Sequence, residues 1–202
     1  MTKSAFSLVA ACSLLLLTGE AHAQSLTLSS PDIKEGATIA NEQVFKGFGC
    51  TGKNISPALN WSGAPAGTKS FAVTMYDPDA PTGSGWWHWV VFNIPPSVTS
   101  LPKGAGNRIP PVVTSLAKGA GYRGKALMPR GAVQSRTDFG TEGYGGPCPP
   151  PGEPHHYQIT VYAVDVAALP NARHRTATAA AVGFDLHSHT LAKATLTGLY
   201  GR

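Results

Sequence analysis

Three short segments of the sequence carry carboxylates and imidazoles that could form one binding site. The first segment is Asp77-Pro78-Asp79-Ala80-Pro81, where two prolines stiffen a turn directly after an apolar run. The second segment, Trp86-Trp87-His88-Trp89, opens the next apolar run. The third segment is GYGGPCPPPG (residues 143–152), which His155-His156-Tyr157 follow.

These residue types favour binding of a small anion. A glycine-rich turn exposes backbone N–H groups that can surround an anion. The imidazoles of His88 and His155 can add charge-assisted hydrogen bonds, and Asp77 can orient one of them. Because a neighbouring carboxylate raises the pKa of a histidine, we expect binding to strengthen as the pH falls toward 6.

Each segment also has a purely structural interpretation. The two aspartates can cap their own backbone in a rigid turn, a strand histidine can be a core residue, and a Gly/Pro run can be only a loop. His187 and His189 add possible metal ligands, but no HExxH or CxxC spacing occurs, and we expect no metal. No GxSxG motif is present, and no motif pairs a nucleophile with a base. We therefore expect no enzymatic activity and no cofactor.

The elements that position these segments are predicted to be mainly strands. Charged residues make up only 13% of the chain, while Gly (23) and Pro (17) are abundant, which indicates many turns. Strands are predicted where β-branched and aromatic residues cluster between Gly or Pro: residues 26–28, 70–76, 87–94, 157–164 and 194–200. The period of two places His88 on one face with Trp86, and Trp87 with Trp89 on the other. Residues 173–182 are alanine-rich and predict a helix that ends at Gly183.

The N-terminus has the pattern of a signal peptide. Lys3 precedes an apolar run, and Ala21-His22-Ala23 supplies small residues for cleavage after Ala23. Residues 24–202 then form a single domain, periplasmic or secreted, with no stable membrane span. An alternative is a lipoprotein box, in which Cys12 becomes the lipidated first residue.

Cleavage after Ala23 would leave two cysteines, Cys50 and Cys148, in an oxidising compartment. We expect them to form a disulfide, and two separate buried thiols are the alternative. The net charge is +5, but the basic residues are scattered singly, so the sequence gives no nucleic-acid footprint.

Residues 94–106 recur almost unchanged at residues 109–121. A single extra copy rich in Gly and Pro is too short for a solenoid and predicts a duplicated, mobile surface connection. Its length favours a rival function, in which the protein inhibits or contacts a kinase, a protease or a host pathway through its loops.

Taken together, the three segments resemble the phosphatidylethanolamine-binding protein family, in its bacterial branch named for Raf kinase inhibitor protein. Further matching stretches are GCTGKNISP (residues 49–57) and RTDFG (residues 136–140). The resemblance implies an antiparallel β-sandwich with a few short peripheral helices, one near the C-terminus. It also implies a pocket for phosphate or a phosphorylated headgroup, with dimers among bacterial relatives. By motif position, the ligand-binding residues would be Asp77, Pro81, Trp86, His88, Gly146, Pro149, His155 and Tyr157.

Overall fold

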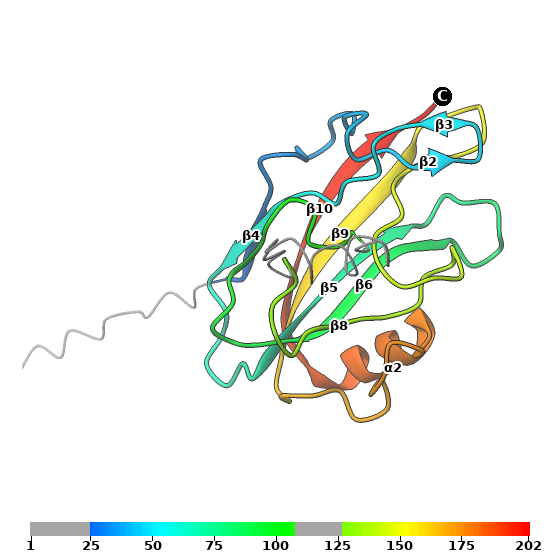
Figure 1. Ribbon diagram of the computed structural model, residues 1–202. Helices are drawn as coiled ribbons and strands as arrows, with labels where there is room; N and C mark the ends of the chain where they lie inside the picture. Colours follow the sequence, from blue (N-terminus) through cyan, green and yellow to red (C-terminus); the bar gives the residue numbers. More distant parts are fainter. Residues whose placement is uncertain (1–24, 108–126) are drawn as a thin grey trace, which may run out of the picture.

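The computed structural model describes residues 25–107 and 127–202, which form two facing antiparallel sheets and one helix at the outer face (Figure 1). The larger sheet has the order β10-β9-β5-β6-β8. Its strands are β5 (Ser70–Asp77), β6 (Trp86–Ile94), β8 (Val133–Gln134), β9 (His155–Val164) and β10 (Thr190–Tyr200). The smaller sheet has the order β1-β4-β7, with β1 (Thr27–Ser29), β4 (Leu59–Ser62) and β7 (Ser100–Leu101). A short hairpin joins β2 (Lys46–Gly47) and β3 (Cys50–Thr51).

The main core lies between the two sheets. Alternate residues of the long strands point into it, which is the period of two expected for a strand buried on this face. Phe71, Val73 and Met75 of β5 meet Leu59 and Trp61 of β4 there, all at most 4% exposed. The mainly β, antiparallel sandwich is thus confirmed.

A second core forms on the opposite face of the larger sheet, under helix α2 (Ala179–His189). Val182 and Leu186 of the helix pack against Val90 and Phe92 of β6. This face of the sheet is therefore also apolar, which explains why β5 and β6 read as nearly continuous hydrophobic runs.

The predicted bounds of this helix are wrong. Alanine content suggested residues 173–182, but the helix begins after Thr178, whose hydroxyl accepts a hydrogen bond from the Ala181 N–H at 3.2 Å. It also continues through Gly183 to His189 instead of ending there. The preceding segment is held outside the helix by Asp185, whose carboxylate accepts hydrogen bonds from the N–H groups of Asn171 and Ala172, both 2.9 Å.

The predicted strands are all present, with small differences at their ends, but the predicted facing of the tryptophans is wrong. Met75 pairs with Trp89, whereas the next residue, Tyr76, pairs with Trp87. At this point β6 contains one extra residue, His88, in a β-bulge, and a second register shift lies between Phe71 and Val73. The bulge interrupts the alternation, so Trp87 packs beside the helix-side core while Trp89 lies in the core between the sheets.

The first copy of the repeat is built into the sandwich. Its residues Ser100 and Leu101 form β7, and Leu101 is fully buried. Gly106 lies so close to the Trp89 indole that an added Cβ would stand 2.7 Å from the ring. The second copy, at residues 109–121, lies outside the described residues.

The predicted disulfide between Cys50 and Cys148 is confirmed, with the two Cα atoms 6.0 Å apart. It links β3 to the proline-rich segment across 98 residues of sequence. In the described part of the chain, no helix is both long and apolar enough to cross a bilayer. The predicted signal peptide and Cys12 lie outside the described residues.

Candidate functional site

The candidate site is organised around Asp77, at the end of β5. Because Asp77 continues the alternation of Val73 and Met75, its side chain points inward and is only 2% exposed. Its Oδ2 accepts a hydrogen bond from His155 Nδ1 at 2.8 Å, and its Oδ1 accepts one from the Asp79 N–H at 2.9 Å. The carboxylate thus fixes both the turn that follows it and the orientation of the His155 ring.

His88 is brought to the same end of the sandwich by the bulge in β6. Its ring meets Tyr157 edge-on, with the ring centroids 5.1 Å apart, and it meets Phe139 at 5.4 Å. Its Nδ1 donates a hydrogen bond to the Gly145 carbonyl at 2.7 Å, since a carbonyl can only accept.

Burial lowers the pKa of His88 to about 4, although the Gly145 carbonyl and the Asp77 carboxylate act in the opposite direction. His88 is therefore neutral at pH 7. The expectation that the pKa of His88 would be raised overall is wrong, because burial among aromatic rings outweighs the effect of the Asp77 carboxylate.

Tyr157 lies between the two histidines and is fully buried. Burial, and after it the Asp77 carboxylate, raises the pKa of its hydroxyl, which stays protonated. That hydroxyl has no hydrogen-bond partner within the described residues. A buried donor without a partner is costly, and such a group commonly marks the place of a water or a ligand.

The glycine-rich segment does not offer the free N–H groups that the sequence suggested. The Gly145 N–H donates to the His88 carbonyl at 2.9 Å, and the Gly146 N–H donates to Asn54 Oδ1 at 2.7 Å. A Cβ at Gly146 would collide with the Gln43 carbonyl. These glycines allow the segment to pack tightly against the chain, and their N–H groups are already used by the protein itself.

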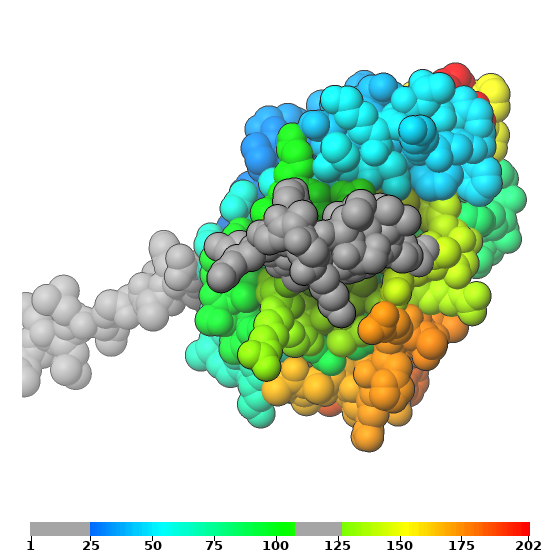
Figure 2. All heavy atoms as spheres, viewed as in Figure 1, coloured from blue at the N-terminus to red at the C-terminus, as the bar shows by residue number. Residues whose placement is uncertain are grey.

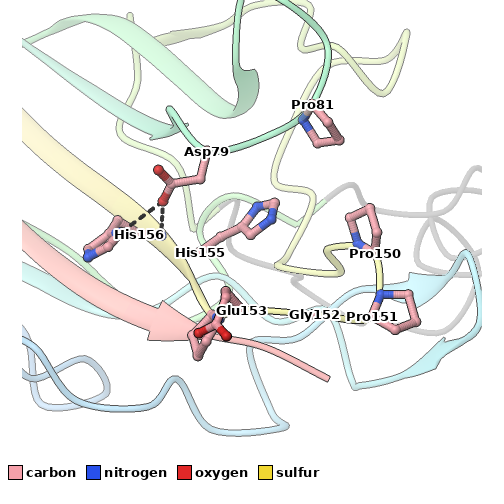
Figure 3. Close-up of a pocket in the computed structure, with 9 residues that line it drawn as sticks. Asp79, Pro81, Pro150, Pro151, Gly152, Glu153, His155 and His156 are labelled. Carbon is pink, nitrogen blue, oxygen red and sulfur yellow. Dashed lines mark hydrogen bonds and ion pairs between the residues drawn. The ribbon is translucent and has the colours of Figure 1, made fainter.

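An open pocket of about 380 Å³ lies in front of His155. The His155 ring extends between Pro81 and the turn at Pro150 and Pro151 (Figure 3). Asp77 contacts this pocket through its hydrogen bond to His155, and its own side chain stays buried.

Two further predicted residues, Trp86 and Pro149, are not among the residues that line this pocket. Trp86 is half-buried and packs edge-on against Phe139, with the ring centroids 5.4 Å apart. Pro149 is buried, and its carbonyl accepts a hydrogen bond from Arg202 Nε at 2.6 Å. In the space-filling view, the cyan hairpin, the yellow proline-rich segment and the red C-terminus gather at one end of the molecule (Figure 2).

Sequence reasoning did not give roles to several residues of this end. His156 donates from both its N–H and its Nδ1 to Asp79 Oδ2, at 2.7 and 2.8 Å, and these bonds lower the pKa of the Asp79 carboxyl. Glu153 lines the same pocket, and Phe139 covers His88. The sequence does contain a signal for these contacts. Successive strand residues point to opposite faces, so the adjacent His155 and His156 can each pair with a different aspartate, Asp77 and Asp79.

Among the described residues, no three side chains of His, Cys, Asp or Glu are grouped as a metal site would require. The imidazole nitrogens that face Asp77, Asp79 and Gly145 are all used in hydrogen bonds. What the arrangement offers is one acidic and imidazole-lined pocket beside a buried tyrosine hydroxyl.

Comparison with known proteins places the chain in a family. The model of the phosphatidylethanolamine-binding protein family matches residues 29–201. The UPF0098 protein YbcL of Escherichia coli is 46% identical over 195 residues, which are 96% of this chain and 97% of that protein. YbhB of the same organism is 46% identical over 175 residues, 87% of this chain and 99% of that protein.

The solved structures agree with this assignment. The crystal structure of E. coli YbcL, described as a new member of the mammalian PEBP family, covers 88% of this chain and 99% of its own, with 47% identity and a TM-score of 0.77. The structure of the PEBP homologue CT736 of Chlamydia trachomatis covers 89% of this chain and 99% of its own, with 28% identity and a TM-score of 0.66. The chain therefore belongs to the phosphatidylethanolamine-binding protein family.

Proposed function

We propose that this protein is an exported, non-enzymatic binding protein for a small phosphorylated ligand that carries an amine, of the phosphoethanolamine type. The observation that carries the proposal is the hydrogen bond between buried Asp77 and His155 at the pocket. Asp77 has a charge that needs a partner, and by holding Nδ1–H of His155 it leaves Nε2 for a ligand. The name of the family model points to the same ligand class.

The phosphate end of the ligand would lie against His155, and a bridging water would link it to Tyr157, which does not itself line the pocket. The Tyr157 hydroxyl is a protonated donor that lacks a partner within the described residues, and the bridging water would satisfy it. Nε2 of His155 shares one proton with the phosphate in the complex. Because a phosphate monoester takes up its second proton near pH 6, affinity should rise as the pH falls from 8 to 6.

The amine end would lie against the carboxylates of the same pocket. Asp79 and Glu153 both line it, and the lowered pKa of Asp79 keeps that group ionised at neutral pH. An ammonium group donates charge-assisted hydrogen bonds to carboxylates. This acidic side of the pocket favours a zwitterionic headgroup over inorganic phosphate.

Binding without catalysis is proposed because the described residues of the site include no activated nucleophile. The hydroxyl of Tyr157 is held protonated. Nδ1 of His88 is bonded to the Gly145 carbonyl and Nδ1 of His155 to Asp77, so neither nitrogen can act as a base for a serine, threonine or cysteine. Export is proposed from the N-terminal sequence together with the disulfide between Cys50 and Cys148. The inhibitor role suggested by the duplicated loop stays a prediction, since the second copy lies outside the described residues.

Calorimetric titration with phosphoethanolamine at pH 6 and pH 8 tests the proposal. Binding at millimolar ligand or tighter is expected, stronger at pH 6. Asp77→Asn should weaken it about tenfold or more, because the amide cannot hold His155 through a charge-assisted bond.

The chain offers a matched control for this variant. Asp165 accepts a hydrogen bond from His189 Nδ1 at 2.9 Å, far from the pocket in the fold, and Asp165→Asn should leave the affinity unchanged. No heat at 10 mM ligand, or an equal loss in both variants, would contradict the proposed site.

A further inference from the structure

A second pocket, also of about 380 Å³, lies on the other face of the larger sheet. Its floor is formed by Thr74 of β5 and Tyr162 of β9, and Trp87 of β6 stands at one side. Helix α2, coloured orange in Figure 1, covers it with Gly183, and β10 closes it with Lys193. This volume is at the lower end of the roughly 300–1,000 Å³ typical of small-molecule sites.

The first sign of a ligand here is Thr74. Thr74 is only 4% exposed, and it lines the pocket. Within the described residues its hydroxyl makes no hydrogen bond, whereas the neighbouring Thr160 hydroxyl is paired with Thr195 at 2.9 Å. A threonine hydroxyl carries one donor and two acceptor positions, which a molecule in the pocket can use.

The second sign is Gly183. It lies inside α2, where glycine is less favourable than alanine, and yet an added Cβ would meet nothing within 4 Å. Neither a turn nor tight packing within the described chain requires a glycine at this position. Glycine does, however, allow a ligand to approach the helix backbone closely from the pocket.

The charge and the walls of the pocket indicate the kind of ligand. None of the described residues that line it is acidic, while Lys193 and His187 lie at its rim. Lys193 has no ion-pair partner within the described chain. The rings of Trp87 and Tyr162 give flat apolar walls, which favour a flat apolar body.

We propose that this second pocket binds a small aromatic carboxylate, with its ring between Trp87 and Gly183 and its carboxylate at Lys193. Thr74 donates its hydroxyl hydrogen to the bound molecule. The proposal is independent of the phosphate site, because Trp87 and His88 lie on opposite faces of β6.

Titration of the nitrogen-15-labelled protein with phenylacetate, followed by two-dimensional NMR, tests the proposal. The expected result is a dissociation constant on the order of 1 mM, with shifts in α2, β9, β10 and the Trp87 indole N–H. Lys193→Gln should weaken binding about fivefold, and Gly183→Leu, which fills the pocket, should abolish it. Thr74→Val, which keeps the side-chain shape, should weaken it several-fold.

Matched controls separate the site from general effects. Lys46→Gln removes an exposed lysine of β2, and Ala180→Leu places the same side chain on the exposed face of α2, so both should retain wild-type affinity. The spectra also show whether each variant is folded. Equal binding of the neutral phenylacetamide, wild-type affinity of Gly183→Leu, or no shifts in α2 and β10 at 20 mM phenylacetate would each overturn the proposal. Asp77→Asn should not change phenylacetate binding, so the two sites are tested separately.

Discussion

Trp87 and His88 are neighbours in β6 but face opposite sides of the larger sheet. Trp87 packs against Tyr76 on the helix side, with tilted rings whose centroids are 4.4 Å apart, while His88 meets Tyr157 in the interior. The bulge at His88 determines which residue faces which side, so that Trp87 lines the pocket under α2 and His88 lies in the interior. It also buries His88 away from water, which has a measurable consequence.

The free energy of unfolding should fall in acid because of His88. Its pKa is about 4 in the folded protein and near 6.5 when unfolded, so between these values the unfolded chain binds more protons and stability rises with pH. The contribution lost between pH 7.5 and pH 5 is about 2 kcal/mol.

Urea denaturation at the two pH values checks this. His88→Gln should show a smaller difference between pH 7.5 and pH 5 than wild type, whereas His174→Gln, at an exposed position, should keep it. An unchanged pH dependence in His88→Gln would show that His88 is not held neutral.

The carboxylates of the first pocket should distinguish phosphoethanolamine from inorganic phosphate. Wild-type protein is expected to bind phosphoethanolamine several-fold more tightly at pH 7, because Glu153 and Asp79 line the pocket and would accept hydrogen bonds from the ammonium. Glu153→Gln should narrow this difference. Competition calorimetry measures the ratio of the two affinities. If wild type and Glu153→Gln prefer phosphoethanolamine over inorganic phosphate to the same extent, Glu153 does not contact the amine.

Loss of the disulfide should reduce stability by roughly 2–4 kcal/mol, because it closes a loop between residues 98 apart in sequence. The double variant Cys50→Ser, Cys148→Ser, compared with wild type in urea denaturation, measures the effect. A reducing agent should destabilise wild type by a similar amount and leave the double variant unchanged. Equal stability of the two proteins would mean that the bridge only links segments already fixed by packing.

Two glycines should respond to alanine in opposite directions. Gly183→Ala should raise the free energy of unfolding by roughly 0.5–1 kcal/mol, since the position is helical and open. Gly106→Ala should lower it by roughly 1–3 kcal/mol, because the new Cβ would press on the Trp89 ring. Denaturation of both variants tests the two environments together; a change of the same sign in both would contradict the packing described for one of them.

Periodicity and composition were sufficient to predict the strands, and the two cysteines of the mature chain in an oxidising compartment were sufficient to predict the disulfide. The sandwich was implied by the resemblance of the motifs to a known family. The bulge at His88 was not predictable, since Trp-Trp-His-Trp alternates regularly and the extra residue is visible only in the pairing with β5. The start of α2 was misplaced because the prediction rested on alanine content alone. It did not consider Thr178 as the N-terminal cap, or Asp185 as a hydrogen-bond partner of Asn171.

At the site, Asp77, His88 and His155 were placed together from their motifs, and the structure brings them to one end of the sandwich. The electrostatics of His88 depended on a fact that no motif contains, namely that Phe139 and Tyr157 pack around the ring. Likewise, the glycine segment looked available for an anion until its partners Asn54 and His88 were known.

The most direct test of the central claim is nitrogen-15 NMR of the histidine rings during titration with phosphoethanolamine at pH 6.5. The account predicts that Nε2 of His155 shifts strongly, that the resonances of His88 shift less, and that His189, paired with Asp165 outside the pocket, stays unchanged. Saturable binding that leaves the His155 ring nitrogens unperturbed would contradict it.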